Sequence, residues 1–530
     1  MHAIPIAIAL VLTLAYAACY ASVNEATYLL DPLHRAMPEL FHRDWFMTTP
    51  TYMPVFGWLT QWLYVIDHEG TTAFLIVQLV VNFATYAAIY WVVQTLDGGW
   101  RAFAIVAGFF TATKGLSMGG NYLLAGYFQP SSLSTLGWIV GMAALARGRY
   151  LLCGIAVACA GAVHANFLVL GIGLFGLTAL ACRELSWRDH AKVMVPQLIV
   201  LACFLPTLLA AAGPSDEAVW ILTTFHAPIH YAPPRLTGWT RDVMGWEVGA
   251  FGALYLLPNI KPVRVFWRFS LVAAVVVVVS ALLIQYTRFE SLTQVRWSRI
   301  APFGQFACAA LITAGLVRQV VTQQPLSLLA RVAIGIALCV PLFYTRRYLH
   351  LVVSARGVWI AGAAMMCALL PWRHVARIGL GALAGMVVVY AIWLRPADNG
   401  LTTPIYATDD EIAMASWVRE QTPVDALFLT PPDLYRFRLL ARRAVIADSK
   451  SPPLRPDLLV QWHHRLTAMV RMPEAKSFLE VEARYYKLTP VELEGIARSF
   501  GAEYVLVRGT GQFAYPPVFH NEEFSIYRLR

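Results

Sequence analysis

The sequence predicts an α-helical polytopic membrane protein with about 11–14 transmembrane helices and a soluble α/β domain at its C-terminal end. Of its 530 residues, 58% are hydrophobic and 14% are charged, and the mean hydropathy is +0.57. Soluble domains carry about 25% charged residues, so this composition is typical of a membrane protein. Apolar segments recur as far as residue 396 or so, and short strand and helix patterns alternate beyond that point.

The apolar segments give the expected spans, since about 20 apolar residues cross a bilayer. The first segment ends in small residues near Ala21, as a signal peptide does, but only His2 offers a basic group before it. We therefore expect an uncleaved anchor. Residues 50–66 are apolar, begin with two prolines, and predict either an interfacial helix or a further span. The expected spans are residues 3–21, 71–95, 101–118, 131–146, 150–164, 166–182, 193–213, 242–258, 269–286, 300–317, 328–344, 357–371 and 377–394.

Charge divides the chain into two expected domains, a transmembrane domain (1–396) with a large first outer loop (22–70) and a C-terminal domain (397–530). The C-terminal domain holds 16 Lys/Arg and 17 Asp/Glu, so the net charge of +10 arises in the membrane part. A basic surface beside a bilayer favours lipid headgroups or phosphates. No basic run carries a nucleic-acid motif, so we expect no nucleic-acid partner. All eight cysteines lie in or beside apolar segments, which indicates packing.

Arginine in the outer loops is the main departure from the usual topology pattern. If the first loop faces outward, Lys and Arg are only slightly more frequent on the inner side. Three outer loops, at 226–241, 286–299 and 344–356, are rich in arginine. A single arginine in such a loop is typical of an interfacial anchor. The whole set favours an anionic ligand, because a guanidinium group can bind two phosphate oxygens at once. Lys114 lies within an apolar segment, where a charge is usually functional.

The C-terminal region predicts alternating elements with no familiar catalytic motif. Nucleotide-binding and common hydrolase motifs are missing from the sequence. The stretch QWHHRL (461–466) suggests metal binding, but adjacent histidines point to different faces of a helix, so we expect a structural role. An odd number of spans would place this domain outside the membrane, with the first loop. Expected strands are 426–430, 444–448, 502–509 and 524–530, and expected helices are 457–472, 474–486 and 490–500.

The first outer loop is acidic, with four carboxylates in SVNEATYLLDPLHRAMPELFHRDWF (22–46). Sugar transfer from a lipid phosphate needs a carboxylate to accept the proton of the incoming hydroxyl, and cations to neutralise the leaving phosphate. Glu25 and Asp44 are the candidate bases. Asp31 precedes a proline and is typical of a turn or a helix start. We expect the loop carboxylates and the outer-loop arginines to meet in one pocket.

This arrangement resembles the C-type glycosyltransferases (GT-C superfamily), multispanning enzymes that use polyprenyl-phosphate sugars. Their catalytic carboxylate lies in the first outer loop, often as Asp-Asp or Asp-Glu. The matching pair here is Asn24-Glu25, which keeps only the second acid. The stretches at 128–167 and 437–453 are similar to a largely uncharacterised bacterial subgroup. The resemblance implies a multi-pass protein of the bacterial inner membrane with an extracytoplasmic C-terminal domain.

The expected function is therefore transfer of a sugar from a polyprenyl-phosphate-linked donor to an acceptor glycan, lipid or protein on the outer face of the bilayer. No metal is required for this chemistry, although a divalent ion is compatible with it. The alternatives are a glycan polymerase or ligase, a transporter or scaffold of envelope polysaccharide assembly, and a catalytically silent relative. Expected catalytic residues are Glu25 and Asp44, and expected substrate-binding residues are Lys114, Gln129, His164, Arg288, Arg296, Arg346 and Arg347.

Overall fold

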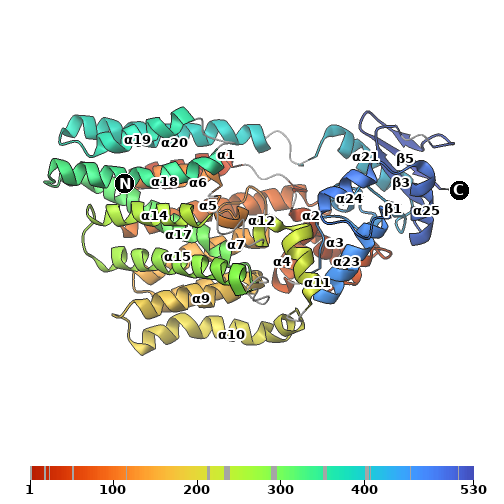
Figure 1. Cartoon of the computed structure of the whole chain (residues 1–530), viewed down its shortest axis with the longest axis horizontal. Coiled ribbons are helices and arrows are strands. Elements are labelled where there is room, and N and C mark those ends of the chain that lie inside the picture. Colours follow the sequence, from red (N-terminus) through yellow and green to blue (C-terminus); the bar gives the residue numbers. More distant parts are fainter. Residues whose placement is uncertain are drawn as a thin grey trace.

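The computed structural model shows a long helical bundle with a small sheet region at one end (Figure 1). Helices α2, α3, α4 and α11, which come from connections between spans, lie at the same end of the bundle as that sheet. The structure describes residues 3–16, 20–22, 24–50, 53–114, 116–211, 215–231, 239–287, 295–349, 355–399, 405, 407–453, 455–510 and 513–529.

The bundle contains a helix at every predicted span, which confirms the fold class of a helical polytopic membrane protein. Among the described residues, five helices are long and apolar enough to cross a membrane, and several shorter apolar helices accompany them. The five are α5 (Thr71–Thr95), α10 (Trp187–Ala211), α15 (Lys261–Thr287), α17 (Ala301–Thr322) and α20 (Arg373–Asn399). The others are α1 (Ala3–Ala15), α6 (Gly99–Thr113), α7 (Pro130–Ala146), α8 (Tyr150–Val163), α9 (Ala165–Ala181), α14 (Thr240–Leu254), α18 (Leu328–Leu349) and α19 (Ala355–Ala368).

Helix α17 forms the centre of the bundle, where it packs against α6, α14, α15 and α20. Its small residues allow these neighbours to approach closely. A Cβ added to Gly315 would lie 3.2 Å from the backbone oxygen of Ala253, and one added to Gly304 would lie 3.0 Å from the Cβ of Ala273. Close approach through small residues is the usual way in which membrane helices associate.

The first outer loop folds into short helices: α2 (Glu25–Tyr28), α3 (Leu30–Ala36), the 3-10 turn η1 (Trp45–Thr48) and α4 (Pro54–Ile66). Helix α4 has 13 residues and is about 20 Å long. It exposes Trp58, Trp62 and Ile66 on one side and buries Phe56 and Tyr64 on the other. Of the two readings of residues 50–66, this geometry favours the interfacial helix.

The C-terminal region is a mixed five-stranded sheet with helices, in the strand order β2-β1-β3-β5-β4. Strand β1 is parallel to β2 and β3, whereas β5 is antiparallel to β3 and β4. The predicted strands and helices are present, and the short strand β4 was not predicted. The elements are α21 (Asp409–Gln421), β1 (Leu427–Leu429), α22 (Phe437–Ala441), β2 (Ala444–Val445), α23 (Pro456–Ala468), α24 (Phe478–Tyr485), α25 (Pro490–Phe500), β3 (Tyr504–Arg508), β4 (Phe519–His520) and β5 (Phe524–Arg528).

The C-terminal region and the first outer loop share one hydrophobic core, so they pack directly against each other. Phe41 and Phe56 of the loop belong to the same buried cluster as Phe428 and Phe437. A buried ionic cluster reinforces the contact, since Arg438 bonds both Asp44 and Asp448. Arg438 thereby joins the loop between β2 and α23 to the first outer loop.

Candidate functional site

A cavity of about 540 Å³ lies where the outer connections meet the C-terminal region. The first loop forms one wall, and the segment 120–131 and the junction of α8 and α9 form another. The remaining walls come from η3 (Ile221–His226), α12 (Pro228–Tyr231) and η4 (Trp297–Ile300), together with the β2–α23 loop. Residues more than 400 positions apart in the sequence therefore face the same space.

Among the described residues, three cationic side chains line this cavity: Arg296, Arg299 and Lys450. Arg296 adopts a left-handed backbone conformation, with φ of 51°, immediately before η4. The Nη1 group of Arg299 donates a hydrogen bond to Nε2 of His164 at 2.6 Å. That bond requires a neutral His164 with its proton on Nδ1, so this histidine orients the guanidinium without adding charge.

Lys450 enters the cavity from the C-terminal region and is positioned through its backbone. Its N–H donates to Oδ1 of Asp448 at 2.8 Å, and its carbonyl oxygen accepts from the hydroxyl of Thr27. Burial lowers the pKa of the Lys450 ammonium, and the nearby positive charge of Arg296 lowers it further. A bound anion would offset both effects, because it favours the charged form of lysine.

Two histidines add neutral hydrogen-bonding groups to the same wall. Burial lowers the pKa of His226 and of His230 to about 3, and Arg296 contributes in the same direction for both. Nδ1 of His230 donates to the carbonyl oxygen of Gly119, a glycine with φ of 69° in the turn η2 (Met118–Gly120). At neutral pH the cavity therefore carries its positive charge on arginine and lysine.

Asp31 is the carboxylate of the cavity, and no other Asp or Glu lines it among the residues that the structure describes. Its Oδ1 accepts a hydrogen bond from Nε of Arg35 at 3.1 Å. The same Nε is 3.1 Å from Oδ2, so Arg35 forms an ion pair with the carboxylate. Oδ2 accepts no hydrogen bond in the described part of the chain and lies against α4. A Cβ added to Gly57 would come within 3.1 Å of that oxygen, so the glycine leaves room for the carboxylate.

A network of amides and phenols lies beside Asp31. Nδ2 of Asn24 donates to the hydroxyls of Tyr122 (3.1 Å) and Tyr127 (2.9 Å) and to Oε1 of Gln129 (3.1 Å). Nε2 of Gln129 donates to the Tyr122 hydroxyl at 3.2 Å. Asn24, Tyr122 and Gln129 line the cavity. The asparagine that replaces the first acid of the expected pair is thus a wall residue.

The two predicted catalytic carboxylates, Glu25 and Asp44, do not line this cavity. Glu25 is 1% exposed, and its oxygens accept from the backbone N–H groups of Ser22 (2.9 Å) and Phe128 (3.1 Å). Burial raises the pKa of its carboxyl to about 8. Asp44 is 2% exposed and accepts from Nη1 of Arg438 at 3.1 Å. Both side chains hold the first loop in place.

The predicted substrate-binding residues divide into three groups. Gln129, His164 and Arg296 line the cavity. Lys114 does not: it ends α6 with φ of 57°, and its carbonyl oxygen accepts from Leu123 and Leu124. Arg288 and the side chains of Arg346 and Arg347 lie outside the described residues.

The sequence indicated ADSKSPPLRP (447–456) as a possible loop over the membrane site but did not single out Lys450. It favoured a turn or helix-start role for Asp31 and gave His226 and His230 no role. His226 and His230 belong to one of the arginine-rich outer loops, where a polar cluster was a usable signal. Lys450 follows a predicted strand in the stretch ADSKSPP (447–453), a position where loops carry binding groups. Nothing local distinguishes Asp31 from the other loop acids.

Comparisons with known proteins give a family match for the C-terminal region and distant structural likenesses for the chain. Residues 409–469 match a family described as a domain of unknown function, DUF6798. This segment includes α21, α22, α23 and the cavity residue Lys450. No curated protein matches the chain.

Two solved structures are similar over nearly the whole length. Both are of ArnT from Cupriavidus metallidurans, one bound to undecaprenyl phosphate and one in the apo state. Each is 13% identical and covers 98% of this chain, and the match extends over 96% and 95% of the respective ArnT chains. The TM-scores are 0.45 and 0.42, so the likeness is one of general arrangement.

Proposed function

We propose that this protein is an integral membrane glycosyltransferase of the C type, which moves a sugar from a polyprenyl-phosphate-linked donor to an acceptor on the outer face of the membrane. One observation carries the proposal: a single cavity at the end of the bundle sets three cations against one carboxylate. Its volume of about 540 Å³ lies within the usual range of small-molecule sites, about 300–1,000 Å³.

The cationic wall binds the phosphate of the donor. Arg296 and Arg299 present planar donors that match phosphate oxygens in pairs, and Lys450 adds a point charge from the C-terminal region. As the sugar leaves, negative charge grows on the bridging phosphate oxygen, and fixed cations stabilise that charge where it develops. The neutral His226 and His230 supply further hydrogen bonds without repelling the arginines.

Asp31 is the base of this reaction. Its carboxylate accepts the proton of the acceptor hydroxyl while the hydroxyl oxygen bonds to the anomeric carbon of the sugar. The bond from that carbon to the phosphate oxygen breaks, and the polyprenyl phosphate leaves with the bonding electrons. Because a phosphate is already a stable anion, no acid is needed to protonate it.

The position of these groups favours a transferase over a transporter. Transporters hold their substrate near the midplane of the bilayer, between broken helices. Here the polar groups line a cavity formed by the outer connections, and Lys450 and Pro452 of the C-terminal region line it too. A polymerase or ligase would use the same phosphate chemistry. The proposal further places the protein in the bacterial inner membrane, with the C-terminal region outside the cytoplasm.

The test is a transfer assay with the purified full-length protein and a panel of polyprenyl-phosphate sugars, measured as release of polyprenyl phosphate. Asp31→Asn removes the base and is expected to lower the rate by about 10²–10⁴-fold. Glu39→Gln is the matched control, because Glu39 is an exposed acid of the same loop that does not line the cavity. Full activity of the Asp31 variant would reject the assignment of the base.

A further inference from the structure

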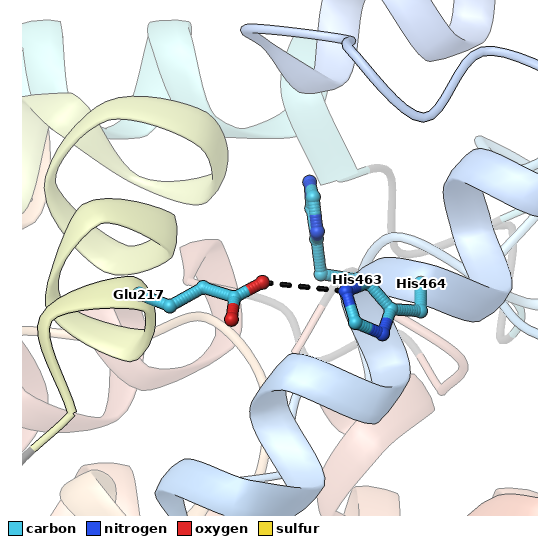
Figure 2. A group of neighbouring side chains, drawn as sticks. All are labelled: Glu217, His463 and His464. Atoms are coloured by element: carbon cyan, nitrogen blue, oxygen red, sulfur yellow. Dashed lines mark ion pairs between the residues drawn. The ribbon is translucent and has the colours of Figure 1, made fainter.

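A second cluster of ligating side chains lies outside the cavity, between the membrane bundle and the C-terminal region. It consists of Glu217 on α11 (Asp216–Trp220) and His463 and His464 on α23. One donor atom from each residue lies within 4.8 Å of the other two. Figure 2 shows the Glu217 carboxylate facing the ring of His464 across the gap between the two helices, with His463 at the neighbouring position.

His463 gives the first indication that this cluster binds a ligand. It is 5% exposed, and neither ring nitrogen has a hydrogen-bond partner among the described residues. The rings of Trp220 and Phe225 pack edge-on against it, with centroids 5.5 Å and 4.5 Å away. Buried polar atoms almost always have a partner, so an unsatisfied imidazole calls for a missing one.

The spacing of the donor atoms also suits a cation. Nε2 of His464 and Oε1 of Glu217 are 3.3 Å apart. That separation is close to the ~3.4 Å between two donors on a tetrahedral ion with bonds of about 2.0–2.1 Å.

We propose that Glu217, His463 and His464 form a binding site for a divalent transition-metal ion, with Zn²⁺ as the best match. Two imidazoles and one carboxylate are a common Zn²⁺ donor set, whereas Mg²⁺ and Ca²⁺ prefer oxygen ligands alone. Glu217 and His464 have side chains that are 50% and 65% exposed, so they offer an entry path and can rotate to close the distances. A water molecule completes the coordination.

The metal joins two parts of the chain that are far apart in the sequence. Helix α11 leads directly into η3, which ends at the cavity residue His226. Helix α23 follows the loop that carries Lys450 into the same cavity. An ion held by both helices therefore fixes two cavity walls relative to each other. This role does not depend on which reaction the cavity performs.

The purified full-length protein in detergent is first treated with a chelator and dialysed. Zn²⁺ is then titrated into it, with binding measured by calorimetry and stability measured by thermal unfolding. The wild type is expected to bind one Zn²⁺ per chain and to unfold at a higher temperature with the ion. His464→Ala and Glu217→Gln change exposed residues and are expected to weaken binding by at least about tenfold and to abolish the thermal shift, in line with the loss of a direct ligand.

His42→Ala is the matched control, since His42 is an exposed histidine of the first loop. It is expected to bind Zn²⁺ as the wild type does. Co²⁺ gives a second readout: its visible absorption should show four-coordinate bands that both ligand variants lose. Equal Zn²⁺ affinity in the wild type and in both variants, or no binding by the wild type, would overturn the proposal and leave an ordinary ion pair between His464 and Glu217.

Discussion

The buried ionic cluster around Arg438 allows a sharp test of how the cavity is assembled. Arg438 is 1% exposed, and its guanidinium donates to Asp44 and Asp448, both 2% exposed. It also donates to the hydroxyl of Ser451, which follows Lys450. The same guanidinium thus joins the first loop to the loop that carries Lys450 into the cavity. The perturbation is Arg438→Met, which keeps much of the side-chain length and removes the charge.

The expected cost follows from the burial of both partners. Removing one member of a buried ion pair costs about 3–5 kcal/mol, because the other charge stays buried without compensation. Here one cation serves two buried carboxylates, so we expect a loss near 5 kcal/mol. Asp448→Asn in the same chain removes one uncompensated charge and should recover part of that loss. Arg455→Met is the control, since Arg455 pairs with Asp457 at the exposed surface, where such pairs contribute about 0–1 kcal/mol.

The assay has two arms. Unfolding of the detergent-solubilised protein measures stability, and limited proteolysis measures release of the C-terminal region from the bundle. Arg438→Met should unfold at lower denaturant and expose the β2–α23 loop to cleavage, whereas Arg455→Met should behave as the wild type. If the two variants are indistinguishable in both arms, the reasoning about the ionic cluster is refuted.

Three further predictions concern the cavity and its pH dependence. Arg296→Met should weaken binding of polyprenyl phosphate by about 10–100-fold, as expected for one hydrogen bond to a charged group, and a filter-binding assay that shows unchanged affinity would contradict this. Glu25→Gln should keep transfer activity, measured as above, because Glu25 bonds the backbone and does not line the cavity. The pKa of Glu25 is raised to about 8. Its contribution to stability is therefore complete below its ordinary pKa near 4.5 and is lost as the pH rises through 8. The melting temperature of the wild type should fall over that range, and that of Glu25→Gln should change less. His226 and His230 have pKa values lowered to about 3, so the stability that they confer is present above pH 6.5 or so and is lost as the pH falls toward 3. A His226→Asn variant whose melting temperature falls with acid as much as that of the wild type would contradict this.

The spans and the C-terminal elements were predictable because each follows from a local pattern. Helix α5 coincides with the apolar stretch 71–95, and α25 begins at a capping box formed by Thr489 and Glu492. Such signals depend only on residues that are close in the sequence. A long apolar segment within a bilayer must also satisfy its backbone hydrogen bonds internally, so it forms a helix.

The cavity was only partly predictable because it depends on which side of each short element faces inward. Asn24 and Glu25 are consecutive, and consecutive helical positions point about 100° apart, so only one of them can face the cavity. The sequence favoured the acid, but the structure places Asn24 in the wall and Glu25 against the backbone of Phe128. The partner of Asp44 is the distant Arg438 and not the adjacent Arg43, a tertiary choice that no local pattern reveals.

The most direct test of the central claim is a cryo-electron microscopy map of the full-length protein with a saturating polyprenyl phosphate. The account predicts phosphate density in contact with Arg296, Arg299 and Lys450, with Asp31 across the cavity from it. Phosphate density elsewhere on the protein, with these three side chains making no contact to it, would contradict the account.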